Sequence, residues 1–118
     1  MEKLPVWCEN EEWCSITATA KLIGKKWHPV IISRLLKKSK GFNQLKRDVG
    51  GISAKVLSES LKDLQEHGIV EKKQISESPK KVNYSLTERG ESLKPVIMSM
   101  KDWGEHNLKA PEASQQQV

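Results

Sequence analysis

Four polar side chains with helical spacing are the residues best suited to bind another molecule. Lys55, Ser58, Glu59 and Lys62 follow one another at i, i+3, i+4 and i+7, so a helix would place them on one side. Lysine donates to guanine or to phosphate, serine contacts either, and glutamate accepts from cytosine or orients a neighbouring lysine. The set suits recognition of base edges, and an ordinary amphipathic helix with a charged exposed face is the competing interpretation.

The segment from Ile52 to Gly68 must position these side chains. Ser53 is an expected N-cap, with Ile52 before it and Leu57 at the spacing of a hydrophobic staple. Gly68 supplies a left-handed end, so the predicted helix runs from Ser53 to about His67. Its predicted buried side consists of Val56, Leu57, Leu61 and Leu64.

A shorter helix is predicted just before this one, from Phe42 to Val49. Asn43 is its possible N-cap, and Gly50-Gly51 forces a break after it. A short helix, a glycine turn and a longer capped helix make a helix-turn-helix, in which the N-terminal end of the second helix faces the bases.

The remaining elements complete a winged helix-turn-helix. Two strand-like runs follow the second helix and make a predicted wing, and Pro95 should kink the last helix. The fold class is therefore mainly α with a small β-hairpin (α+β). The predicted elements are helices at 15–23, 28–37 and 87–108, strands at 69–75 and 82–86, and a loop at 76–81. The predicted organisation is an N-terminal arm (1–14), the winged helix-turn-helix domain (15–108) with a dimerisation helix (87–108), and a disordered tail (109–118).

Positive charge is confined to the middle of the chain. The 118 residues have a net charge of +5, whereas residues 21–81 alone have fifteen lysines and arginines against six acidic residues. Such a distribution indicates a polyanionic partner, and a solvated lysine surface is the simpler alternative. Besides Ser53, Lys55, Ser58, Glu59 and Lys62, the expected DNA contacts are Lys40, Lys46, Arg47, Lys72, Lys73, Lys80 and Lys81. Lysines at a hairpin edge also deter aggregation.

Several pieces of the chain together match a known pattern. They are Cys14, LIGKKW at 22–27, FNQL at 42–45, GISAKVL at 51–57, LKDL at 61–64, GIVE at 68–71 and VNYSLTERG at 82–90. The chain resembles the HxlR-type transcriptional regulators, which are related to the MarR regulators, from about Cys14 to Gly104. The resemblance implies a homodimer that binds a near-palindromic operator on double-stranded DNA. It also implies that the N-terminal and C-terminal helices form the dimer. The dimer candidates are Trp13, Ile97, Met100 and Trp103, and the stripe on the last helix could instead cover only its own domain.

Some members of this family sense oxidants through a cysteine near the N-terminus, and Cys14 matches that position. A thiolate there could form a disulfide between subunits, with Cys8 as a second candidate. Two features oppose this: Ser15 stands where many members have proline, and Glu11 and Glu12 disfavour a thiolate. A buried, inert cysteine is the alternative.

The sequence gives no sign of an enzyme, a metal site, a cofactor or a membrane span. There is no phosphate loop or nucleophile elbow, and the cysteine and histidine spacings do not match zinc ligands. No run is long and apolar enough to cross a membrane, and the start does not resemble a signal peptide, so we expect a cytoplasmic protein. A low-specificity chromatin-like DNA-binding protein and a winged-helix module for protein contacts are the alternatives to a regulator.

Overall fold

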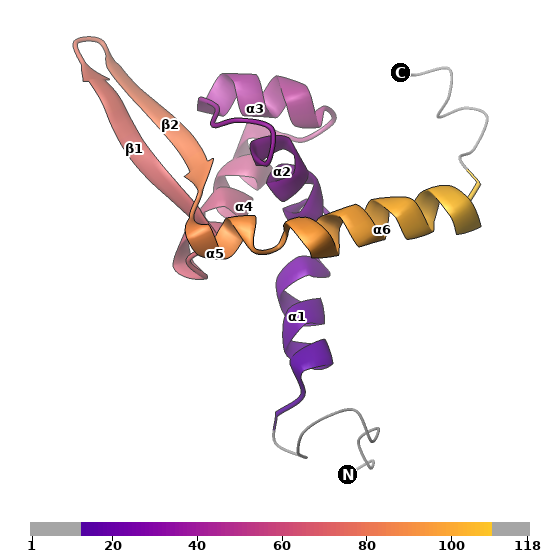
Figure 1. Cartoon of the computed structure of the whole chain (residues 1–118). Coiled ribbons are helices and arrows are strands. Elements are labelled where there is room, and N and C mark those ends of the chain that lie inside the picture. Colours follow the sequence, from indigo (N-terminus) through magenta and orange to yellow (C-terminus); the bar gives the residue numbers. More distant parts are fainter. Residues whose placement is uncertain (1–12, 110–118) are drawn as a thin grey trace.

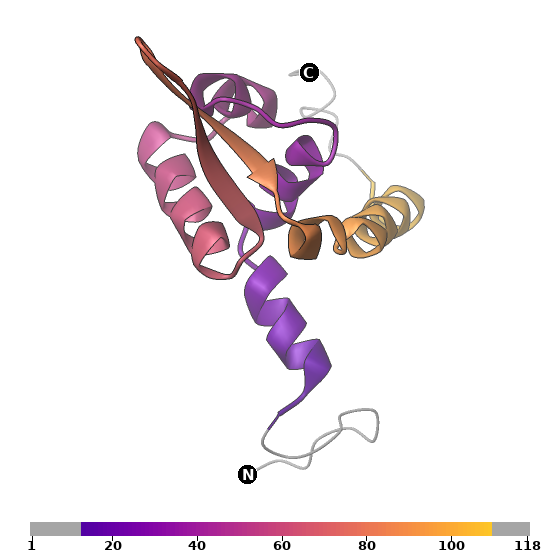
Figure 2. The same cartoon turned by 60° about the vertical axis from the view of Figure 1, so that its left-hand side comes forward.

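The computed structural model describes residues 13–109 (Figure 1). A two-stranded antiparallel hairpin projects from a body of helices, and α1 extends from the opposite end of that body (Figure 2). The elements are α1 (Ser15–Ile23), α2 (His28–Leu35), α3 (Phe42–Val49), α4 (Ala54–Glu66), β1 (Val70–Glu77), β2 (Lys80–Leu86), α5 (Glu88–Glu91) and α6 (Lys94–Asn107). Within the described range, no helix combines the length and apolar character needed to cross a bilayer. The predicted fold class is confirmed.

The core lies where α2, α3 and α4 meet the base of the hairpin. It is formed by aliphatic side chains that are almost completely buried, together with Tyr84. From α2 come Ile31, Ile32 and Leu35, and from α4 come Leu57, Leu61 and Leu64. Burial of these faces is the main force that holds α4 in place, because apolar burial dominates the stability of a small domain.

The hairpin is longer than the sequence suggested. Pairing runs from Val70 opposite Leu86 to Glu77 opposite Lys80, which leaves only Ser78 and Pro79 in the turn. The predicted loop at 76–81 is therefore wrong, because these polar residues are exposed in the strands and give no alternating signal. A bulge between Gln74 and Ser76 leaves Ile75 outside the ladder, with 61% of its surface exposed.

The C-terminal segment contains a break where a kinked helix was predicted. The Thr87 hydroxyl accepts a hydrogen bond from the Gly90 backbone N–H at 3.0 Å, which caps the short α5. Pro95 lies in the first turn of α6, where its missing N–H leaves no hydrogen bond unmade. One helix therefore ends with α5 and another begins with α6. The prediction of a single helix kinked at Pro95 is wrong.

Three other helix ends differ from the expectation. Helix α2 ends at Leu35, not Lys37, and α3 is capped by Gly41 without a side-chain bond, not by Asn43. Gly68 has the predicted left-handed conformation, with φ of 73°. Gly24 is right-handed, with φ of −78°, and a β-carbon there would collide with the Ala20 carbonyl oxygen. Glycine is needed at position 24 for space, not for its backbone freedom.

Gly90→Ala and Gly104→Ala form a matched pair that tests how closely α5 packs against Ile69 and Leu86. A β-carbon at Gly90 would overlap the Ile69 carbonyl oxygen and lie 3.1 Å from Leu86 Cδ2, whereas nothing lies within 4 Å at Gly104. We expect Gly90→Ala to lower the free energy of unfolding by about 1–3 kcal/mol. Gly104→Ala should raise it by up to about 1 kcal/mol, since alanine favours a helix interior. Urea denaturation measures both, and equal effects would contradict the packing at Gly90.

Candidate nucleic-acid interface

Helix α4 presents an uninterrupted polar face near its N-terminal end. We call the exposed side chains of Lys55, Ser58, Glu59 and Lys62 the recognition face. Within residues 13–109 neither lysine of this face forms an ion pair, so both ammonium groups are available to a ligand. The opposite side of the helix is buried in the core, which fixes the face outward.

The turn before α4 gives the helix its start and its direction. Ser53 Oγ accepts a hydrogen bond from the Val56 backbone N–H at 3.1 Å, as predicted for the N-cap. Gly50 and Gly51 both have φ of 70°, which is the conformation that a side chain would oppose. Ile52 and Leu57 belong to the same buried cluster, as the staple spacing predicted. The first turn of α4 is thus held by one polar bond and one apolar anchor.

Val56 is the residue that sequence reasoning placed on the wrong side. It was predicted in the core, but 37% of its surface is exposed beside the recognition face. Its position directly between Lys55 and Leu57 was the available signal, because a full helical projection places it between the exposed and the buried face. An exposed aliphatic group near the helix N-terminus can contact a thymine methyl group, which neither lysine nor glutamate does.

The hairpin lysines are exposed, but they are not equivalent. Lys73 Nζ lies 3.2 Å from Glu71 Oε1, and Lys72 Nζ lies 6.0 Å from the centre of the Tyr84 ring. Lys80 and Lys81 stand next to the hairpin turn with no ion pair in the described chain. The two lysines near the tip are therefore the stronger candidates for phosphate contacts, because in the described residues neither forms an ion pair, as Lys73 does, or a ring contact, as Lys72 does.

Lys40 does not join the other basic side chains. Its side chain is 5% exposed, and its Nζ lies 2.9 Å from Asp48 Oδ2. Its backbone exchanges two hydrogen bonds with Tyr84, at 3.0 and 2.7 Å, which ties the segment before α3 to the hairpin. Because both its charge and its backbone are already used inside the domain, we leave Lys40 out of the interface.

The ion pair with Lys40 also changes the titration of Asp48. The hydrogen bond from Lys40 lowers the Asp48 pKa below its usual value of 3.8, and Lys40, Arg47 and Lys38 add electrostatic attraction against a desolvation that raises it. The resulting stabilisation is complete above pH 3.8 and is lost as the pH falls through the lowered pKa.

Two basic residues of α3 remain accessible. Arg47 is exposed and Lys46 is half-buried, so both can reach a ligand from α3.

The structure brings these basic elements to one end of the molecule. Helix α3, the N-terminal end of α4 and the hairpin tip lie together at the end opposite α1 (Figure 2). A protruding helix face beside a basic hairpin matches the shape of duplex DNA, whose major groove admits a helix while the backbone lies on either side.

Comparison with known proteins agrees with this geometry. A sequence model of the HxlR-like helix-turn-helix family matches residues 22–112. The chain belongs to the HxlR-like helix-turn-helix family. YybR of Bacillus subtilis, an HTH-type transcriptional regulator, is 37% identical over 98 residues, which span 83% of this chain and 78% of YybR. This HxlR-like chain is therefore a DNA-binding transcriptional regulator with a winged helix-turn-helix.

Two solved structures show the same fold. A MarR-family transcriptional regulator from Porphyromonas gingivalis superposes with a TM-score of 0.78 and 35% identity, covering 84% of this chain and 97% of that one. The oxidised form of the redox regulator HypR superposes with a TM-score of 0.76 and 35% identity, covering 82% and 100%.

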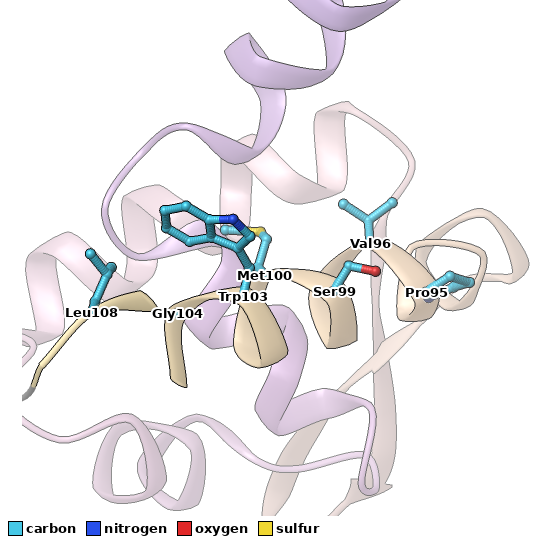
Figure 3. A pocket seen from close by; sticks show the side chains of 7 residues that line it. All are labelled: Pro95, Val96, Ser99, Met100, Trp103, Gly104 and Leu108. Atoms are coloured by element: carbon cyan, nitrogen blue, oxygen red, sulfur yellow. The ribbon is translucent and has the colours of Figure 1, made fainter. Parts of the chain in front are cut away.

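A second surface of the HxlR-like chain is apolar and lies on α6. Val96, Met100 and Trp103 project from the same side of this helix (Figure 3), and Trp103 is 61% exposed. They line a groove of about 760 Å³, which we call the α6 groove; its lining is Pro95, Val96, Ser99, Met100, Trp103, Gly104 and Leu108. Ile97, expected at the same surface, is 5% exposed and belongs to the core, so it is not free to meet a partner.

Helix α1 has an apolar side as well. Ile16, Ala20 and Ile23 share one side of it, and Ile16 is 53% exposed. Trp13, just before α1, is 50% exposed. Cys14 is buried at the N-cap of α1, and Cys8 lies outside the described residues.

Proposed function

We propose that this chain is a homodimeric, sequence-specific regulator that binds a near-palindromic operator on double-stranded DNA in the cytoplasm. Helix α4 enters the major groove, and Lys80 and Lys81 meet the backbone beside it. The observation that supports this most is the recognition face, with two unpaired lysines on a capped helix whose other side is buried. Ser53, Lys46, Arg47, Lys72 and Lys73 are the flanking contacts.

Glu59 favours specific recognition over a chromatin-like role. A carboxylate on a DNA-facing surface repels phosphate, so it weakens binding that depends on charge alone. It gains a partner only where a donor such as the cytosine amino group is presented in the groove. A protein-interaction module is also less suitable, because Val56 is the one large hydrophobic side chain exposed in α4.

The apolar groove supports the dimer. Exposed tryptophan and methionine on a helix that already contributes Ile97 to its own core are best explained by a partner that covers them. A two-fold dimer would present two recognition helices to half-sites about one helical turn apart, and such an operator is near-palindromic.

A second proposal concerns redox control through Cys14. It rests on the likeness to HypR, a redox regulator, and on the position of Cys14 at the N-cap of α1. Two thiols that form a disulfide release two electrons and two protons, which a two-electron oxidant such as a peroxide accepts. A change between thiol and disulfide at the start of α1 would act on one of the two terminal helices that the family resemblance assigns to the dimer.

Selection of duplexes from a random pool tests both proposals in one experiment. Reduced protein should enrich a palindromic consensus, and its affinity should fall steeply with salt because lysines release counterions. Peroxide treatment should change that enrichment in the natural chain but not in Cys14→Ser. Absence of any consensus would refute the regulator proposal, whereas a consensus that is indifferent to peroxide would refute only redox control.

A further inference from the structure

The carboxylate of Asp63 links the recognition helix to a distant part of the chain. Its Oδ2 lies 2.7 Å from His28 Nε2 and 3.1 Å from Lys25 Nζ, and its Oδ1 lies 3.8 Å from His67 Nδ1. Lys25 lies in the turn that joins α1 to α2, and His28 is the first residue of α2. One side chain of α4 is therefore bonded to residues 35 and 38 positions away.

The bond from His28 is the structurally important one. Lys25 is exposed, and an exposed ion pair contributes little. The His28 side chain is 4% exposed, and its hydrogen bond is the largest cause that lowers the Asp63 pKa below 3.8. The carboxylate is therefore charged at neutral pH and accepts, so His28 Nε2 is the donor.

The other ring nitrogen shows that His28 is not there simply to fill space. His28 Nδ1 is buried and has no hydrogen-bond partner in the described chain. A buried polar atom without a partner is unfavourable, and an apolar side chain of similar volume would avoid that penalty. What an apolar residue would not provide is a directional bond to Asp63.

Direction matters because the rest of the α4 contact is apolar. Leu57, Leu61 and Leu64 hold the helix to the core and keep the recognition face outward, but apolar attraction is non-directional, so it sets the exact rotation less sharply than a hydrogen bond does. A side-chain tip lies about 5–6 Å from a helix axis, so a rotation of about 10° moves it by about 1 Å. A hydrogen bond to a base edge keeps its strength only over donor–acceptor distances that differ by about 0.5 Å, which is half of that displacement.

We infer that Asp63, held by His28, is a positioning residue that sets the rotation of the recognition face. Asp63 follows Lys62 directly and lies on the flank between the recognition face and the buried side. The hydrogen bond between His28 and Asp63 joins the first residue of α2 to α4. A movement of the turn between α1 and α2 would therefore also move the recognition face. The inference rests on the proposed function, because it assigns a role within specific DNA binding.

Asp63→Ala tests the inference, with Glu66→Ala as the matched control. Alanine leaves no acceptor for His28 Nε2, whereas the amide oxygen of an asparagine could still accept that hydrogen bond. Both changes remove one negative charge from α4, so both should strengthen binding to random duplex. The readout is the ratio of affinities for the selected operator and for random duplex, measured well below the unfolding temperature of each variant. We expect Asp63→Ala to lower this ratio about tenfold and Glu66→Ala to leave it unchanged, and equal ratios would overturn the inference.

A second pair keeps the test decisive if Asp63→Ala fails to fold. His28→Gln retains a donor that can reach Asp63, whereas His28→Leu retains only volume. We expect the glutamine variant to keep a specificity ratio several-fold above that of the leucine variant, and identical ratios would overturn the inference. If the unmodified chain prefers no duplex at all, the proposed function fails first and this role falls with it.

Discussion

Lys55→Ala is expected to weaken binding of the selected operator by roughly fivefold to a hundredfold. A lysine near the N-terminal end of a major-groove helix contributes about 1–3 kcal/mol when it contacts a base edge. Lys55 is exposed, is free of ion pairs in the described structure, and lies in the first turn of α4. Its removal therefore leaves the fold intact and takes one donor from the groove.

Lys21→Ala is the control for this prediction. Lys21 is an exposed lysine of α1, at the end of the molecule opposite the hairpin tip. Fluorescence anisotropy with operator and random duplex should show a selective loss for Lys55→Ala and almost no change for Lys21→Ala. An equal loss on both duplexes for Lys55→Ala would mean that Lys55 contacts phosphate, and no loss would remove it from the interface.

Local patterns were sufficient to predict most of the helix-turn-helix. The bounds of α1 and α3 agree with the prediction, and the Ser53 cap and the Gly50-Gly51 turn appear as expected. These features depend on residues close in sequence, where cap geometry and glycine backbone preferences act directly. The charge distribution in turn predicts which part of the chain faces DNA, and this stays a prediction.

Features set by tertiary contacts were missed. Lys40 was predicted to be a surface cation, but Asp48 lies eight positions later, and only the fold shows that the two meet and that the Lys40 side chain is buried. Ile97 and Trp103 share one helix, yet one enters the core and the other stays exposed, which depends on how α6 crosses α2. The Asp63 link to His28 spans 35 positions and leaves no local signal.

Trp103→Glu is expected to convert the dimer to a monomer and to abolish tight operator binding. Tryptophan is a common hot spot, and losing one in the centre of an interface costs about 2–4 kcal/mol, or roughly 30-fold to 1,000-fold in the dimer dissociation constant. A buried carboxylate adds a further penalty. Because Trp103 is 61% exposed in the single chain, the substitution should leave the fold of the monomer unchanged, as its far-ultraviolet circular dichroism spectrum would show.

Met98→Glu provides the matched control, because it adds the same charge to α6 outside the groove lining. Sedimentation velocity should show a dimer for Met98→Glu and a monomer for Trp103→Glu. A monomer binds one half-site alone, so it loses the second attachment that raises affinity by about a hundredfold or more in a linked pair. Binding to random duplex, which depends on charge, should fall far less. A dimeric Trp103→Glu would show that subunits meet elsewhere, and the exposed apolar face of α1 would then become the next surface to test.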